Sequence, residues 1–316
     1  MKKLLVVLLT LSMLLSGSAL AELVATEDVT VYTRPDHWMT DLESLFDESH
    51  TYYDLYYAGE NSRESQKLHL VLPEGEGPFP VFIYVHGGGW SGLNSNEHSI
   101  GYTGEAGIYA VSKGYALAAV DYPLLPEGDV NLHDMMVSVK AAIRFLRANA
   151  ETYNLDPDKF ALQGESAGGQ LVDIVGTTNG ETQYDDPALG NEGVSSDVQA
   201  VVSWYSLANV GPELIGWLYA VDTSTLTEEE IQAMVDESSA IKHIDENDPP
   251  FLLQVGLIDA EVPYTQTLDF YNDLAMAGVD VTVDIFPGYG HAVTGFTCDE
   301  NAERIVEWLN GVFGIE

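Results

Sequence analysis

The sequence contains a single cysteine, Cys298, among its 316 residues. One cysteine cannot form a disulfide within the chain, so the fold must be held together by its apolar core. A chain of this length can bury a substantial core within one large domain. It also lacks internal repeats and low-complexity tracts, which argues against a repeat architecture.

Basic residues are scarce: 12 Lys and Arg stand against 50 Asp and Glu, for a formal net charge of -38 at pH 7. Such an acidic surface repels polyanions, which argues against nucleic acid and anionic membranes as partners. We interpret the acidity as a solubility device in an extracellular setting. A calcium-binding loop, about twelve residues with regularly spaced oxygen ligands, is also missing, and we predict no metal site.

Long apolar runs are missing after the N-terminal segment. The one at the start spans Leu4–Leu15, follows two lysines, and leads into small residues that end in Ala19-Leu20-Ala21. This pattern predicts a secretory signal peptide at residues 1–21, cut before Glu22. The run is shorter than the roughly 20 residues of a membrane span, so an uncleaved anchor is the weaker alternative. We therefore expect a secreted protein, extracellular or periplasmic, without stable membrane insertion.

Short apolar runs alternate with amphipathic patterns along the rest of the chain. Several runs lack polar alternation, which is typical of strands buried on both faces of a parallel sheet. The predicted strands cover residues 67–72, 80–85, 115–120, 160–162, 200–204, 251–255 and 281–285. Apolar residues at helical spacing predict helices over 132–146, 268–274 and 305–312. The pattern predicts an α/β domain with a mostly parallel central sheet and helices on both faces.

Two segments depart from this rhythm. Too few residues separate Leu72 from Pro80 for a helical crossover, so we expect the first strands to be antiparallel. Residues 207–250 contain an apolar-aromatic stretch and then Thr227-Glu228-Glu229-Glu230, which is typical of a capped helix start. We interpret this segment as a small cap-like insertion over the sheet edge, within one domain of residues 22–316.

The segment Gly164-Glu165-Ser166-Ala167-Gly168 lies between a predicted strand and a predicted helix at residues 170–175. A nucleophile at a sharp strand-to-helix turn needs small neighbours, because its backbone is strained and its flanks nearly touch. The G-x-S-x-G pattern alone is weak, and an ordinary tight turn is the alternative. The strand–turn–helix setting is what predicts Ser166 as a nucleophile.

The segment His86-Gly87-Gly88-Gly89-Trp90 directly follows the predicted strand at 80–85. Consecutive glycines let backbone N–H groups point into a cavity and stabilise an oxyanion, each donor contributing about 2.7–4 kcal/mol. A phosphate-binding loop is the alternative, but the Lys and Ser/Thr of a Walker pattern do not follow. We interpret His86 as a structural residue that holds the loop.

Candidates for a base and an orienting acid follow two later strands. Asp259 comes after the strand at 251–255, where its carboxylate could orient an imidazole, and Glu261 is the alternative acid. His291 lies in Gly288-Tyr289-Gly290-His291-Ala292, after the strand at 281–285. Of the eight histidines, it alone combines a strand-end position, glycine neighbours and a place after the candidate serine and acid in the chain. The order Ser, Asp, His is the one expected for an α/β-hydrolase.

The motifs HGGGW, GESAGG, GLIDAEVP and GYGHA resemble the hormone-sensitive-lipase-like branch of the α/β-hydrolases. Within that branch the chain is most similar to bacterial feruloyl and acetyl-xylan esterase-type proteins. The resemblance implies an oxyanion hole formed by the backbone N–H groups of Gly88, Gly89 and Ala167. It also implies a carboxylic-ester substrate, often an acyl group on a plant polysaccharide. The chain departs from the usual pattern at Glu165, where the family commonly has Asp.

The sequence therefore predicts a secreted serine carboxylesterase that works through an acyl-enzyme and needs no cofactor. Its expected partner is a small ester or an acylated saccharide, and Trp90 and Trp204 are candidates for contact with it. An amidase, formamidase or peptidase with the same triad is one alternative. A non-catalytic binding protein on the same fold is another.

Overall fold

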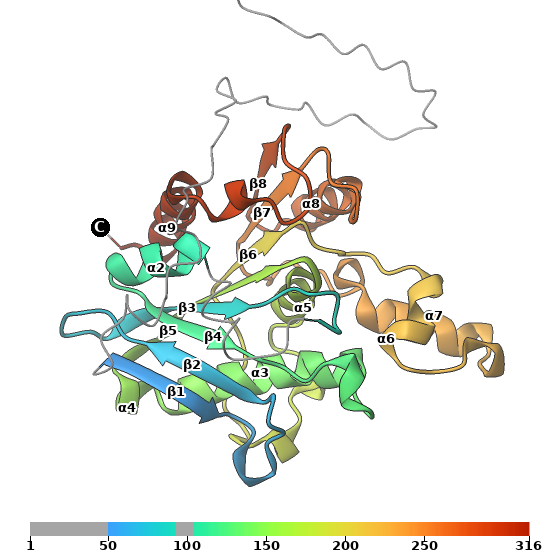
Figure 1. Cartoon of the computed structure of the whole chain (residues 1–316), viewed down its shortest axis with the longest axis horizontal. Helices are drawn as coiled ribbons and strands as arrows, with labels where there is room; N and C mark the ends of the chain where they lie inside the picture. Colours follow the sequence, from blue (N-terminus) through green and yellow to red (C-terminus); the bar gives the residue numbers. More distant parts are fainter. Residues whose placement is uncertain (1–49, 93–103, 316) are drawn as a thin grey trace, which may run out of the picture. The chain divides into compact units, whose positions relative to one another are not determined.

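An eight-stranded sheet runs through the residues that the computed structural model describes, 50–92 and 104–315. The predicted signal peptide lies outside these ranges. The strands are β1 (Thr51–Tyr56), β2 (Lys67–Val71), β3 (Phe79–Val85), β4 (Ala116–Val120), β5 (Leu155–Glu165), β6 (Ala200–Trp204), β7 (Phe251–Gly256) and β8 (Val281–Phe286). Their order in the sheet is β1-β2-β4-β3-β5-β6-β7-β8 (Figure 1). Strands β3 to β8 are mutually parallel, which confirms the mostly parallel sheet.

The first two strands are antiparallel to their neighbours, as expected from the short connection before β3. Strand β2 pairs with β1 on one side and with β4 on the other. It does not pair with β3, the next strand in the sequence. The antiparallel start is therefore confirmed, and β2 reaches the sheet one position away from its sequence neighbour.

Alternating side chains of the buried strands face two separate cores. Val81, Ile83 and Val85 of β3 belong to one core, together with apolar residues of helices α3 (Leu132–Ala148), α5 (Ser166–Gly176) and α8 (Thr265–Ala277). Phe82 and Tyr84 belong to the core on the other face, together with apolar residues of α2 (Gly104–Ser112) and α9 (Asp299–Phe313). A short helix, α4 (Ala150–Tyr153), follows α3. Helices thus cover both faces, as predicted (Figure 1). Within the described ranges, no helix is both long enough and apolar enough to cross a membrane.

Three of the twelve basic residues lie on α3 and fasten the long loop of residues 177–199 between α5 and β6. The Lys140 ammonium donates to the Thr178 carbonyl at 2.9 Å. The Arg144 and Arg147 guanidinium groups donate to the carbonyls of Asp186 and Asp197, at 2.8 Å and 2.6 Å. The loop is therefore held on α3 mainly through its backbone.

The segment 207–250 lies between β6 and β7 and contains α6 (Ile215–Leu218) and α7 (Glu228–Ser238), with the short 3-10 turns η7 (Pro212–Leu214), η8 (Thr223–Thr225) and η9 (Ala240–Lys242). Helix α7 begins where the sequence predicts. The Thr227 hydroxyl accepts from Glu230 N, and the Glu230 carboxylate accepts from Thr227 N. At the other end of α7, Glu237 pairs with His133 of α3 at 2.7 Å. A role for this segment as a cap remains a prediction.

Candidate active site

Ser166 is the first residue of α5 and directly follows β5. Its φ of 51° lies in the left-handed region, a conformation that costs a non-glycine residue about 1–3 kcal/mol. A Cβ on Gly168 would collide with the carbonyl oxygens of Val85 and His86. Only glycine at position 168 lets α5 pack this closely against the end of β3. The turn therefore places the serine hydroxyl at the carboxyl edge of the sheet.

His291 and Asp259 meet Ser166 at this edge, on the loops that follow β8 and β7. The His291 Nε2 atom lies 2.9 Å from Ser166 Oγ, and Nδ1 lies 2.7 Å from Asp259 Oδ2. The other carboxylate oxygen, Asp259 Oδ1, accepts from the backbone N–H groups of Glu261 and Val262 at 2.9 Å each. A carboxylate beside Nδ1 keeps the proton there and leaves Nε2 free to accept from the serine. The structure thus joins the three predicted residues in one hydrogen-bonded chain.

The two candidate acids differ in where they lie around the imidazole. The Asp259 side chain is fully buried and faces Nδ1. Glu261 Oε2 lies 3.9 Å from Nε2, and the Glu261 side chain is 75% exposed. Since Nε2 is the atom that faces the serine, Glu261 cannot orient the ring from the opposite side. Only Asp259 has the geometry of the orienting acid.

The glycine loop lies beside the serine. A Cβ on Gly87 would come within 3.2 Å of Ser166 Cβ. Gly88 and Gly89 have φ values of 105° and 60°, in the region that favours glycine. Ala167 is the second residue of α5, and the first N–H groups of a helix have no partner within the helix. The glycine loop therefore lies next to the start of α5, and an oxyanion hole formed by the backbone N–H groups of Gly88, Gly89 and Ala167 remains a prediction.

His86 is buried directly before this loop. Its ring stacks on Tyr122, with centroids 4.4 Å apart and planes 14° apart. The Tyr122 hydroxyl donates to the His86 carbonyl at 2.8 Å, and His86 Nδ1 lies 2.8 Å from the Gly87 carbonyl. These contacts hold the end of β3 and the start of the glycine loop.

Trp90, at the end of the glycine loop, is partly exposed. Its indole N–H donates to Gln170 Oε1 at 2.8 Å, and Gln170 Nε2 donates to the Ser238 carbonyl at 2.8 Å. Gln170 lies on α5, one turn after Ser166, and Ser238 ends α7. Gln170 therefore connects the glycine loop to segment 207–250.

Trp204 lies in a different environment from the one we expected. Its side chain is 1% exposed and packs between Tyr205 and Phe296 in the core under α9. A side chain enclosed in this way has no surface to offer a ligand, so the expectation of substrate contact was wrong for Trp204. The residue that reaches the site is its neighbour Tyr205, whose ring centroid lies 4.7 Å from that of His291.

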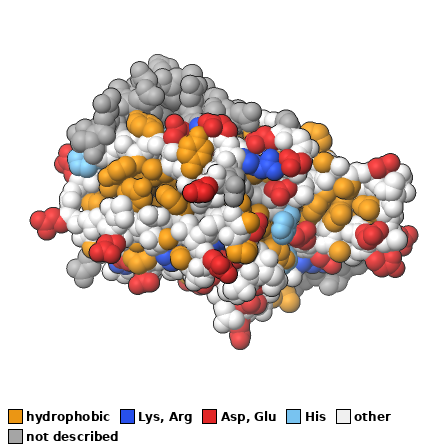
Figure 2. Space-filling view, turned by 90° about the horizontal axis from the view of Figure 1, so that it is seen from below, with side chains coloured by type: hydrophobic (Ala, Val, Ile, Leu, Met, Phe, Trp, Pro, Cys, Tyr) orange, Lys and Arg blue, Asp and Glu red, His pale blue; other side chains and the backbone are white. Residues whose placement is uncertain are grey.

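Two buried carboxyl groups flank the serine along the chain. Glu165, directly before it, accepts hydrogen bonds from the Tyr84 and Tyr205 hydroxyls, while burial raises its pKa. Asp173, two turns along α5, accepts from the Ser206 hydroxyl, and burial raises its pKa to about 7. Many other carboxylates are exposed, and Figure 2 shows them scattered over one face of the molecule with few basic side chains.

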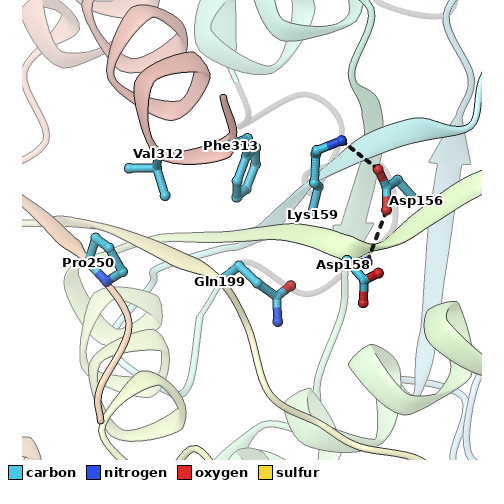
Figure 3. A pocket seen from close by; sticks show the side chains of 7 residues that line it. All are labelled: Asp156, Asp158, Lys159, Gln199, Pro250, Val312 and Phe313. Carbon is cyan, nitrogen blue, oxygen red and sulfur yellow. Dashed lines mark hydrogen bonds and ion pairs between the residues drawn. The ribbon is translucent and has the colours of Figure 1, made fainter. Parts of the chain in front are cut away.

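A hollow of about 450 Å³ opens at the opposite edge of the sheet (Figure 3). It is lined by Asp156, Asp158, Lys159, Gln199, Pro250, Val312 and Phe313. Lys159 Nζ pairs with Asp156 at 2.7 Å. These residues lie near the start of β5, β6 and β7, whereas Ser166 follows the end of β5. The hollow is therefore separate from the candidate active site.

The chain is similar to known proteins in sequence and in structure. Among curated proteins, Esterase LipC of Mycobacterium tuberculosis is 30% identical over 246 residues, which make up 74% of this chain and 59% of LipC. The chain spans about half the length of the curated relatives that it matches.

Two solved structures share the fold. A truncated form of a carbohydrate esterase from gut microbiota has a TM-score of 0.72 at 24% identity, covering 84% of this chain and 98% of that one. A bifunctional GH43-CE protein of Bacteroides eggerthii has a TM-score of 0.74 at 25% identity, covering 84% of this chain and 36% of that one. The BD-FAE family model matches residues 68–274, more than half of the sequence. The chain therefore belongs to the BD-FAE family and has the α/β-hydrolase fold.

Proposed function

We propose that this chain is a secreted serine carboxylesterase that hydrolyses its substrate through an acyl-enzyme on Ser166. The observation that carries the proposal is the hydrogen-bonded chain from Asp259 through His291 to Ser166. Its relatives support the same chemistry, since LipC is named an esterase. Neither a metal nor an organic cofactor is needed for this reaction.

In the proposed first step, His291 Nε2 takes the proton of the Ser166 hydroxyl as Oγ attacks the ester carbonyl carbon. The carbonyl oxygen becomes an oxyanion, which accepts from the backbone N–H groups of Gly88, Gly89 and Ala167. Asp259 stabilises the imidazolium that forms. The imidazolium then gives its proton to the leaving alcohol, and the acyl group stays on Ser166.

The second step repeats this sequence with water. His291 takes a proton from the water as its oxygen attacks the acyl-enzyme carbonyl, and returns a proton to Ser166 Oγ as the acid leaves. The balance is one ester and one water consumed, one acid and one alcohol released.

We infer that the substrate is an acylated saccharide, with acetyl or feruloyl groups on plant polysaccharide as the acyl donors. The names of both structural neighbours, a carbohydrate esterase and a GH43-CE protein, support this substrate class. The net charge of -38 favours neutral over anionic esters. Glu261 adds a negative charge at the mouth of the site, 3.9 Å from His291 Nε2.

The proposed location rests on the N-terminal sequence, with its two lysines, short apolar run and A-L-A end. Secretion would remove residues 1–21 and give a mature N-terminus at Glu22. Mass spectrometry of the protein recovered from the medium or periplasm tests this proposal. A protein that retains Met1 and stays with the membrane would refute it.

The test of the activity is a screen of p-nitrophenyl esters of rising chain length, beside methyl ferulate, acetylated xylan and a matched acyl anilide. We expect turnover of short-chain esters and of at least one saccharide ester. Ser166→Ala should lower kcat by up to about a millionfold while the protein remains folded. Faster turnover of the anilide than of the matching ester would make the chain an amidase. A Ser166→Ala variant with more than about a tenth of wild-type turnover would refute the mechanism.

A further inference from the structure

Glu165 is a buried carboxyl group that the proposed reaction does not use. Its side chain is 6% exposed, and it directly precedes the nucleophile. Tyr84 of β3 donates to Glu165 Oε1 at 3.1 Å, and Tyr205 donates to Oε2. The backbone N–H of Gly87 also faces the carboxylate. An ionised carboxylate is an acceptor only, so these three donors favour the charged form of Glu165, while burial opposes it and raises its pKa.

Tyr205 connects this carboxylate to the base. Its hydroxyl donates to Glu165, while its ring lies against the His291 ring at a centroid distance of 4.7 Å and an interplanar angle of 61°. Its φ of 37° is rare for a bulky residue. Strained backbone of this kind persists where the surrounding structure fixes it, and such positions cluster at active sites. The hydrogen bond to Glu165 is one of the contacts that fix Tyr205.

We propose that Glu165 and Tyr205 form a positioning pair that holds the His291 ring against Ser166 and stabilises the imidazolium formed during catalysis. The inference rests on the proposed function, since it assigns a role within the same reaction. Tyr205 supports the ring from the side, and the Glu165 charge acts through a desolvated interior. Glu165 touches neither substrate nor serine oxygen, so it works through His291.

Other ionisable groups also lie close to His291 and Glu165. His291 faces Asp259 and Glu261 from the loop after β7. Glu165 faces Tyr84, Tyr122 and Tyr205, and His291 from the loop after β8. Asp259 and Glu261 also favour the imidazolium, so the contribution of Glu165 must be separated from theirs. The effect of Glu165 can be separated from that of Glu261 by adding salt, because salt screens an exposed charge far more than a buried one.

The experiment replaces Glu165 by glutamine, which keeps the size of the side chain and removes its charge. The titration of His291 is followed by NMR of the imidazole, assigned with His291→Asn, and the pH profile of kcat/KM is measured with a neutral ester. For E165Q we expect both midpoints to move to lower pH by about half a unit or more, because the imidazolium loses a stabilising charge. We expect kcat to fall several-fold with KM nearly unchanged.

Glu261→Gln is the matched control, because it removes an exposed carboxylate near the same imidazole. Its shift should largely disappear at about 1 M salt, where the Debye length is about 3 Å. The E165Q shift should persist there. An E165Q midpoint equal to that of wild type, or a shift that salt abolishes, would overturn the proposal. The NMR titration needs no substrate, so it decides this question even if no ester is turned over.

Tyr205→Phe tests the link between the two groups, and it keeps the proposal testable should E165Q not fold. The variant keeps the ring and removes the hydroxyl that donates to Glu165. We expect a several-fold lower kcat with unchanged KM and a displaced acid limb of the kcat/KM profile. Tyr115→Phe is its control, because Tyr115 is also buried and donates to Asn310 of α9, away from the site. Equal kcat and pH profiles for the two variants would contradict the positioning role.

Discussion

Replacing the buried Asp173 by asparagine is expected to stabilise the protein at neutral and alkaline pH. Asp173 is a residue of α5 and is completely buried, which raises its pKa from 3.8 to about 7. At about 1.4 kcal/mol per pH unit, this rise corresponds to roughly 4 kcal/mol against the charged form. The charged form of Asp173 therefore destabilises the native state relative to the unfolded chain.

The sign of the pH dependence follows from proton binding. Below pH 3.8 the carboxyl group is protonated in both states and costs nothing. Between pH 3.8 and about 7 the unfolded chain ionises while the native protein keeps its proton, so the free energy of unfolding falls as pH rises. Above about pH 7 the loss is complete. An asparagine has no such charge, so its advantage over Asp173 grows across this range.

Urea unfolding of wild type and Asp173→Asn at pH 5 and pH 8 measures this difference. The advantage of the variant should grow by roughly 3 kcal/mol between the two pH values. The free-energy cost of packing the new amide is the same at both pH values. It therefore does not affect the difference between them. Glu303→Gln, an exposed replacement on α9, is the control and should show little increment. An Asp173→Asn increment near zero would refute the reasoning from burial.

Three further outcomes follow from the site and from α3. Asp259→Asn should leave the fold intact and lower kcat for a p-nitrophenyl ester by about 10⁴-fold, because the imidazole loses its orienting acid; near wild-type turnover would contradict the assignment of the acid. Glu261→Gln should raise kcat/KM for an anionic ester more than for its neutral analogue at low salt, and a salt-independent difference would count against charge repulsion. Lys140→Met should make loop 177–199 more sensitive to limited proteolysis, since the Thr178 carbonyl loses its donor; an unchanged cleavage pattern would show that Arg144 and Arg147 suffice.

The sequence predicted every strand of the described residues except β1. The apolar runs correspond to β2 through β8, although β5 extends well beyond the predicted residues 160–162. Strand β1 lies at the sheet edge with Tyr52, Tyr53 and Tyr56 exposed, so it has no apolar run to reveal it. An apolar pattern indicates which residues are buried but not which strand lies beside which. The pairing of β2 with β4 was therefore out of reach.

The same distinction applies to the site. Ser166, Asp259 and His291 each follow a predicted strand, and parallel strands bring their carboxyl ends to one edge, so their meeting could be expected from the motifs. The contact between Glu165 and Tyr205 depends on β5 and β6 being neighbours. It also depends on the left-handed backbone at Tyr205, for which no glycine in the sequence gave a signal. The sequence also does not show that the Trp204 side chain is enclosed in the core, where it cannot contact a substrate.

The hydrogen bonds from α3 to loop 177–199 limit which changes in the sequence of this loop the protein can accept. Main-chain oxygens occur at every position whatever the side chain, and three of them, on Thr178, Asp186 and Asp197, receive the cations of α3. Replacing residues along the loop therefore leaves its path over the helix in place. Adding or removing a residue would shift these oxygens out of register with α3. We therefore expect the loop to tolerate a change of side chain better than a change of length, except where a side chain itself binds α3, as Asp185 does with Arg144.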